Sequence, residues 1–160
     1  MNLAATAPGW LAFLQVLLLV LAAGEDAWRL RISNVTIVGL LAGAAVAAII
    51  AGPSFALWQN FALFAGLLAL GTMAFAAGKL GGGDVKLVAV SGAWFDLDGG
   101  LLMVICTLLA GGLLALLILL LRLFSWPEKI RERVAVLRPG SGIPYGMAIA
   151  AGSLIVMRLQ

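Results

Sequence analysis

The stretch that decides the fold runs from Val35 to Gly78 and reads VTIVGLLAGAAVAAIIAGPSFALWQNFALFAGLLALGTMAFAAG. It contains no charged residue. A helix that crosses a bilayer needs about 20 mostly apolar residues, so this stretch is too long for a single crossing. It breaks at Gly52-Pro53-Ser54 and becomes polar again at Gln59-Asn60. It therefore predicts two membrane-spanning helices, at about 35–52 and 57–77.

Apolar runs on both sides extend this pattern over the rest of the chain. Of the 160 residues, 64% are hydrophobic and 11% are charged. Soluble domains have roughly 45–50% apolar and about 25% charged residues, so this composition excludes an ordinary soluble globule. We expect an all-α integral membrane protein with six transmembrane helices, forming a single domain over residues 1–160. The predicted spans are about 8–24, 35–52, 57–77, 84–97, 99–122 and 142–158.

The Lys and Arg residues orient these spans, because cytoplasmic loops carry an excess of them. With six spans and the N-terminus outside, the basic loop Ser125–Arg138 is cytoplasmic and only Arg158 lies outside. The segment 84–97 is short, since about 14 helical residues cover only about 21 Å of a core about 30 Å thick. It must still cross, or the basic loop would lie outside. The basic residues thus flank membrane spans and give no reason to expect nucleic-acid binding.

The residue types present exclude several kinds of active site. The chain has no His and a single Cys, Cys106, which lies in an apolar run. This excludes Ser-His-Asp triads, Cys-His nucleophiles and HExxH zinc sites, as well as disulfides and CxxC pairs. We expect no cofactor and no metal, and an enzyme of this composition would have to use carboxylates, lysine or hydroxyl groups.

Two carboxylates stand at the ends of predicted spans. Asp26 follows the first span and Asp84 opens the fourth, and the predicted topology brings both to the cytoplasmic face. Ionisable residues at membrane depth are costly and are candidates for function. Two neighbouring carboxyls can share one proton, so that one acts as base and the other as acid when water attacks an amide. Taken singly, Asp84 could be a helix cap and Asp26 a solvated loop residue.

Three short motifs follow one another along the chain. The first is Asp26 with Ile32-Ser33-Asn34, the second is Gly81-Gly82-Gly83-Asp84, and the third is Ile143-Pro144-Tyr145-Gly146 before a span rich in Ala and Gly. In this order, and with six spans, they resemble the prepilin peptidase (type IV leader peptidase) family of GxGD aspartyl proteases.

The resemblance implies a multi-pass aspartic endopeptidase of the bacterial inner (cytoplasmic) membrane. In that family, the residues that match Asp26 and Asp84 form the catalytic pair. The reaction removes the leader from a prepilin at the cytoplasmic face, after a Gly and just before the hydrophobic helix of the pilin. The implied partners are prepilin or pilin-like precursors and membrane lipids.

The sequence departs from the family pattern in two places. The family usually reads Ile-Pro-Asn where this chain has Ile32-Ser33-Asn34. Larger members also carry a cytoplasmic insert with a four-Cys zinc site and methylate the new pilin terminus, whereas this chain has one Cys. It resembles the short, peptidase-only members linked to Flp-type tight-adherence pili, and we expect no methyl transfer.

Several residues are expected to support the pair: Gly81, Gly83, Lys86, Asn34, Pro144, Tyr145 and Gly146. Gly81 and Gly83 would let a substrate strand or another helix approach closely. Lys86 would either extend its amine to the inner face of the membrane, bind the acidic residue that prepilins carry early in the mature helix, or tune Asp84. Glu25 matches no position of the family, and we expect it to be solvated.

A second class of function remains open. In a small ion-coupled transporter or channel subunit, Asp26 and Asp84 would be cation ligands. Transporter sites usually lie near the midplane of the bilayer, often between inverted repeats. Both Asp residues lie near one predicted face and the chain has no visible repeat, which favours the peptidase.

Overall fold

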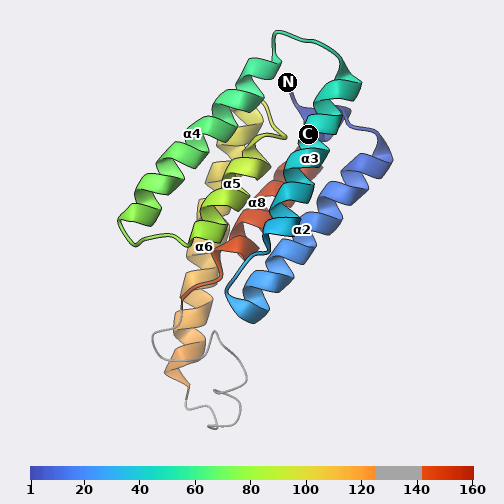
Figure 1. The fold of residues 1–160 in the computed structure, drawn as a ribbon. Coiled ribbons are helices and arrows are strands. Elements are labelled where there is room, and N and C mark those ends of the chain that lie inside the picture. The colour runs from blue at the N-terminus through green and yellow to red at the C-terminus, as the bar shows by residue number, and fades with distance from the viewer. Residues whose placement is uncertain (125–141) are drawn as a thin grey trace.

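The computed structural model describes residues 1–124 and 142–160, which form helices joined by turns and contain no strand (Figure 1). The all-α prediction is confirmed for these residues. The predicted basic loop Ser125–Arg138 lies outside them. The helices are α1 (Leu3–Thr6), α2 (Gly9–Arg29), α3 (Asn34–Ala51), α4 (Leu57–Ala76), α5 (Gly82–Gly92), α6 (Leu97–Leu123) and α8 (Tyr145–Leu159).

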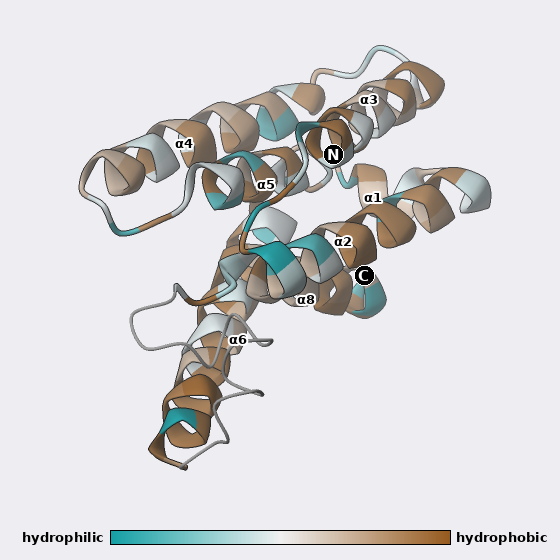
Figure 2. Cartoon of the chain, turned by 60° about the horizontal axis from the view of Figure 1, so that its bottom comes forward, coloured by the Kyte–Doolittle hydropathy of each residue, from teal (hydrophilic) through white to brown (hydrophobic). Residues whose placement is uncertain are grey.

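Four of these helices, α2, α3, α4 and α6, are long and apolar enough to cross a membrane. Helix α8 is apolar but has 15 residues, and α5 has 11. Large apolar side chains cover the outer surface, for example Phe13, Phe61 and Leu109, which are 69%, 72% and 69% exposed. Figure 2 shows α3, α4 and α6 as mostly hydrophobic along their length. Such surfaces are suited to lipid rather than to water, and the chain is a membrane protein.

The short helices α5 and α8 form the inside of the bundle. Helix α5 packs against α3, α4 and α8, and α8 packs against α2, α5 and α6. Small residues permit this close approach. A Cβ at Gly71 of α4 would lie 2.8 Å from Cγ1 of Val85, and one at Gly152 of α8 would lie 2.7 Å from the backbone nitrogen of Thr107. Close packing of this kind is a main source of helix association in bilayers.

Helix α5 ends well before residue 97, where the predicted fourth span ends. Trp94 and Phe95 follow it in a turn inside the protein and are 1% and 0% exposed. Nδ2 of Asn60 donates to the carbonyls of Ala93 and Phe95 at 3.0 and 2.9 Å. These bonds give acceptors of the buried turn a partner, because Ala93 caps α5 and Phe95 lies beyond it. The predicted span is therefore an 11-residue helix followed by a buried, hydrogen-bonded turn.

Helix α2 continues to Arg29, beyond the predicted end of the first span at residue 24. Asp26 consequently lies in the last turn of the helix and not after it. Leu30 ends the helix in the left-handed conformation, with φ of 52° and ψ of 35°. Few residues other than Gly adopt positive φ. Figure 1 shows the end of α2 beside the first turns of α5 and α8, and both chain termini at the opposite end of the bundle.

Candidate active site

Asp26 joins the end of α2 to the start of α8. Its side chain is 4% exposed, and its Oδ2 accepts the backbone N–H of Gly146 at 2.7 Å. Gly146 is the second residue of α8, and the first N–H groups of a helix have no partner within the helix. The residue before α8 is Pro144, and its side chain provides no cap. The Asp26 carboxylate therefore supplies the acceptor that the start of α8 lacks.

Asp84 lies in the first turn of α5 and is 9% exposed. Asp84 and Asp26 line the same cavity, so their carboxyls lie near each other. A Cβ at Gly81 would lie 2.8 Å from Oδ2 of Asp84, so the position before the helix has no room for a side chain while Asp84 keeps this orientation. The two aspartates thus approach each other at the N-terminus of α8.

Asp26 and Asp84 line the same cleft, which has a volume of about 260 Å³. Its other walls are the loop Leu30–Ile32 and the glycines Gly81–Gly83. Because the glycines carry no side chains, they leave the space beside both carboxyls open. The cleft offers two acidic groups, backbone amides and Arg31 to a polar ligand.

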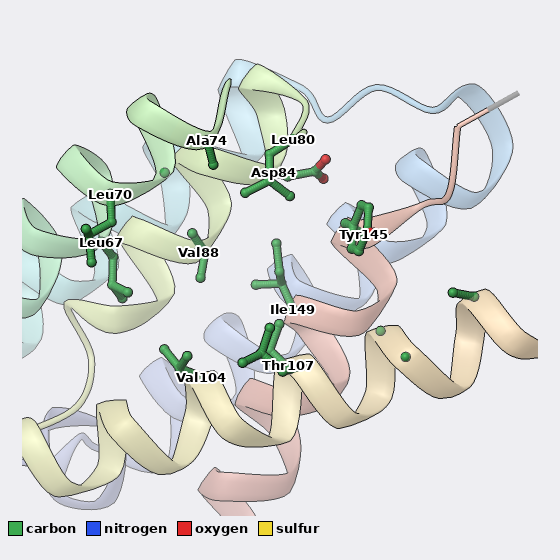
Figure 3. A pocket seen from close by; sticks show the side chains of 15 residues that line it. Leu67, Leu70, Ala74, Leu80, Asp84, Val88, Val104, Thr107, Tyr145 and Ile149 are labelled. Atoms are coloured by element: carbon green, nitrogen blue, oxygen red, sulfur yellow. The ribbon is translucent and has the colours of Figure 1, made fainter. Parts of the chain in front are cut away.

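A larger, apolar groove begins on the other side of Asp84. It has a volume of about 440 Å³ and is lined by residues of α4, α5, α6 and α8. Figure 3 shows Asp84 and Tyr145 toward one end of this groove and Leu67 and Leu70 toward the other. Leu70 and Leu108 line it and are 66% and 69% exposed, so the groove opens on the outer, apolar surface of the bundle. Asp84 therefore borders a polar cleft on one side and an apolar groove on the other.

The model of the type IV leader peptidase family matches residues 13–119 of the chain, which is more than half of its length. The chain belongs to this family. The match includes Asp26 and the segment Gly81–Lys86, whereas Pro144–Gly146 lie beyond it. Searches of curated proteins and of solved structures found no match.

Membership makes this chain a leader peptidase-like protease, and the family implies pilin precursors as its substrates. Two adjacent carboxyls that share one proton can provide both the base and the acid that peptide hydrolysis requires. In the parts of the chain that the structure describes, no group of three or more His, Cys, Asp or Glu side chains could hold a metal ion. The acidic groups that line the cleft are the carboxyls of Asp26 and Asp84.

Ile32 lies between α5, which carries Asp84, and α8, whose first turn binds Asp26. A Cβ at Gly83, in the first turn of α5, would lie 3.4 Å from Cβ of Ile32. A Cβ at Gly146 of α8 would lie 2.9 Å from Cδ1 of Ile32. The sequence placed Ile32 in a motif but did not suggest a role. Glycines in the two other motifs were the available signal, because each leaves room for a neighbouring side chain.

Lys86 and Asn34 bind each other. Nζ of Lys86 donates to Oδ1 of Asn34 at 3.1 Å, and both side chains are exposed. Lys86 is two positions after Asp84, and residues with this spacing point to different faces of a helix. The bond links α5 to the first residue of α3, a contact that none of the three predicted roles of Lys86 included.

Helix α8 begins within the third motif, Ile143-Pro144-Tyr145-Gly146. Pro144 is buried and directly precedes the helix, which begins at Tyr145 and not at residue 142 as predicted. Tyr145 packs against α6, where a Cβ at Gly111 would lie 3.7 Å from its ring. Tyr145 and Asp84 both line the apolar groove, so the motif contributes to the groove as well as to the cleft.

The prediction that Glu25 is solvated is wrong. Its side chain is half-buried, and Oε2 accepts the backbone N–H of Ser33 at 2.8 Å and the hydroxyl of Thr36 at 3.3 Å. Because α2 continues through this position, Glu25 is held next to the start of α3. The sequence contained no direct signal for this contact.

Proposed function

We propose that this member of the type IV leader peptidase family is an aspartic endopeptidase in which Asp26 and Asp84 are the catalytic pair. The observation that carries the proposal is that both carboxyls line one cleft, where the Gly146 N–H donates to Asp26. Side chains that lie far apart in the sequence are buried together there, although burial of carboxylates is costly. Such an arrangement is characteristic of functional sites.

The proposed reaction uses a single proton shared by the pair. The ionised carboxylate removes a proton from a water molecule while the water oxygen attacks the scissile carbonyl carbon. The protonated carboxyl transfers its proton to the carbonyl oxygen, which gives a tetrahedral diol. The C–N bond then breaks as the first carboxyl passes its proton to the leaving nitrogen. A diol hydroxyl returns a proton to the other carboxylate, and the pair regains its starting state.

The two cavities beside Asp84 support a substrate with one polar and one apolar part. The cleft would hold the polar residues before the scissile bond, and Arg31 on its wall is available to backbone carbonyls or acidic groups. The groove would hold apolar residues after the scissile bond, because its lining is almost entirely aliphatic or glycine. Prepilins have this order, with a polar leader followed by a hydrophobic helix. The single Cys favours the Flp-type subgroup, whose members have no four-Cys insert.

We also propose a single domain over residues 1–160 in the bacterial inner membrane, with six spans, the N-terminus outside and the cleft on the cytoplasmic side. The positions of Arg29, Arg31 and Lys79 support this orientation, because all three lie near the helix ends that form the cleft. In this proposal, α5 and α8 are two of the six spans. They are short and lie inside the bundle, where the longer helices surround them.

The test compares the purified protein with Asp26→Asn and Asp84→Asn, which keep the shape of each side chain. A prepilin-like precursor with Gly before its hydrophobic segment is the substrate. Each variant should abolish cleavage without changing insertion or the melting temperature of the protein by more than a few degrees. Asp98→Asn, at an exposed carboxylate in the first turn of α6, is the matched control and should be fully active. Near-normal cleavage by either cleft variant would refute the pair.

A further inference from the structure

Glu25 binds the backbone at the point where the loop after α2 enters α3. The Ser33 N–H donates to Oε2 of Glu25 at 2.8 Å, and the Thr36 hydroxyl donates to the same oxygen at 3.3 Å. The Ser33 hydroxyl oxygen accepts the N–H of Val35 at 3.1 Å and caps α3. Glu25 therefore accepts from the N–H of the residue that caps the helix, and the loop is fixed at this end.

The loop fixed in this way forms a wall of the cleft. Leu30 to Ile32 line the cleft together with both aspartates. Ile32 directly precedes Ser33 and lies against the first turns of α5 and α8, at Gly83 and Gly146. A shift of Ser33 would move Ile32, which separates the helix that carries Asp84 from the helix that binds Asp26.

Glu25 and Asp26 are successive residues in the last turn of α2. Successive residues do not share a helix face, and here their carboxylates bind different partners. Asp26 binds the start of α8, and Glu25 binds the start of α3. The last turn of α2 is therefore held from two sides.

We propose that Glu25 is a positioning residue for the aspartate pair. By accepting the Ser33 N–H, it keeps Ile32 between α5 and α8 and so maintains the relative placement of the Asp26 and Asp84 carboxyls. Glu25 does not line the cleft, and it acts on the reaction only through the loop. This inference rests on the proposed function.

The backbone at Ser33 provides a sharp test. Its φ of −66° and ψ of 136° are angles that Pro adopts readily. Pro has no backbone N–H, so Ser33→Pro removes the donor that Glu25 satisfies. Leaving a partly buried N–H without its acceptor destabilises the folded protein, whereas removing the donor and the acceptor together can leave its stability nearly unchanged. The effect of substituting Glu25 should therefore depend on whether residue 33 has an N–H.

The experiment measures kcat and KM for precursor cleavage in the full chain and in four variants: Glu25→Ala, Glu25→Gln, Ser33→Pro and the double variant Glu25→Ala with Ser33→Pro. Glu25→Ala should lower kcat at least about tenfold, because misplacement of catalytic groups by about 1 Å can cost about a hundredfold. KM should change little. Glu25→Gln keeps an acceptor oxygen and should retain at least about half of the activity. On the Ser33→Pro background, adding Glu25→Ala should lower kcat by less than about threefold.

Two results would overturn the proposal. One is a normal kcat per folded enzyme in Glu25→Ala, whether or not its melting temperature falls. The other is an equal loss of kcat from Glu25→Ala on both backgrounds. If Ser33→Pro does not fold, equal losses in Glu25→Ala and Glu25→Gln would overturn it. If the proposed function holds, Asp26→Asn and Asp84→Asn are inactive whatever the Glu25 variants do. A failure of the Glu25 proposal can therefore be distinguished from a failure of the proposed catalytic pair.

Discussion

Gly146 donates its backbone N–H to Oδ2 of Asp26 at 2.7 Å, and a Cβ at Gly146 would lie only 2.8 Å from that same oxygen. The N–H and the absent side chain both face the carboxylate. The start of α8 therefore tolerates only glycine at this position if the Asp26 carboxyl is to keep its place and its hydrogen bond.

Gly146→Ala should lower both activity and stability. The new methyl group would lie 3.0 Å from Cβ of Asp26 and 2.9 Å from Cδ1 of Ile32, so α2 or α8 must move. Overpacking of this kind costs about 1–3 kcal/mol. We expect a lower melting temperature and at least about a tenfold loss of kcat. Gly66→Ala in α4, where no atom lies within 4 Å, is the control and should leave both unchanged. An unchanged cleavage rate in Gly146→Ala would contradict the site geometry.

Gly81→Ala should lower activity but not stability. Its methyl group would meet only the Asp84 carboxyl, with Oδ2 at 2.8 Å, and that side chain can rotate away without moving a helix. The backbone of Gly81, with φ of −75° and ψ of 146°, suits Ala. We expect at least about a tenfold lower kcat at an unchanged melting temperature. Gly24→Ala in α2 is the control, because no atom lies within 4 Å of its Cβ position and it does not line the cleft. Equal activities of the two variants would argue against a role for the Asp84 orientation.

Gly112→Leu should weaken the binding of precursors that carry a hydrophobic segment. Gly112 lines the apolar groove and has no atom within 4 Å of its Cβ position, so a side chain can be added there without displacing a neighbour at Cβ, and it would take up space at the groove. KM for the full precursor should rise at least about fivefold, with a smaller change in kcat. Gly66→Leu makes the same substitution in α4 outside the groove and should leave KM unchanged. A KM unaffected by Gly112→Leu would show that the groove does not hold the substrate.

Cleavage should persist after removal of divalent metal ions. Within residues 1–124 and 142–160, no group of three or more His, Cys, Asp or Glu side chains could hold a metal ion. Hydrolysis by two carboxyls needs only a shared proton and water. We expect the initial rate to be the same before and after dialysis against EDTA. Loss of cleavage that a single added metal restores would indicate that the two Asp residues bridge a metal ion.

Single cysteines on a Cys106→Ser background would test the proposed orientation. Lys79 precedes the cleft end of α5, whereas Phe55 and Asp98 are exposed at the other end of the bundle. In intact cells, a membrane-impermeant thiol reagent should label Phe55→Cys and Asp98→Cys but leave Lys79→Cys unlabelled. Permeabilised cells should show labelling of all three. Labelling of Lys79→Cys in intact cells would reverse the proposed orientation.

The sequence predicted the long helices well, since the length of an uncharged apolar run indicates the length of the helix that crosses the membrane. The runs at 35–52 and 57–77 correspond to α3 and α4 almost residue for residue. The ends of α2 and α5 were predicted poorly, because tertiary contacts decide them. Glu25 and Asp26 looked like loop residues but are helical, and their carboxylates have partners on other elements. Trp94 looked like part of a span, yet it lies in a turn stabilised by contacts with distant residues.

For the candidate site, the sequence singled out Asp26 and Asp84 by residue type and motif, and the structure places them in one cleft. Their catalytic role stays a prediction. The contribution of the Gly146 N–H could not be predicted, because every residue except Pro has a backbone N–H and the residue type does not show which one is used. The contact between Glu25 and Ser33 was hidden for a similar reason. Where the family usually has Pro, this chain has a residue with an N–H, and the acceptor for that N–H comes from a position outside the family pattern.

The place of Asp84 between two cavities has a consequence for product release. Under the proposed function, hydrolysis leaves a polar leader in the cleft and a hydrophobic product in the groove. The leader would depart into water past Gly81–Gly83, and the hydrophobic product would depart sideways into lipid past Leu70 and Leu108. Neither product would have to pass the carboxyl pair. The enzyme could therefore complete a turnover without separating its helices, which suits a bundle whose inner helices are packed through glycines.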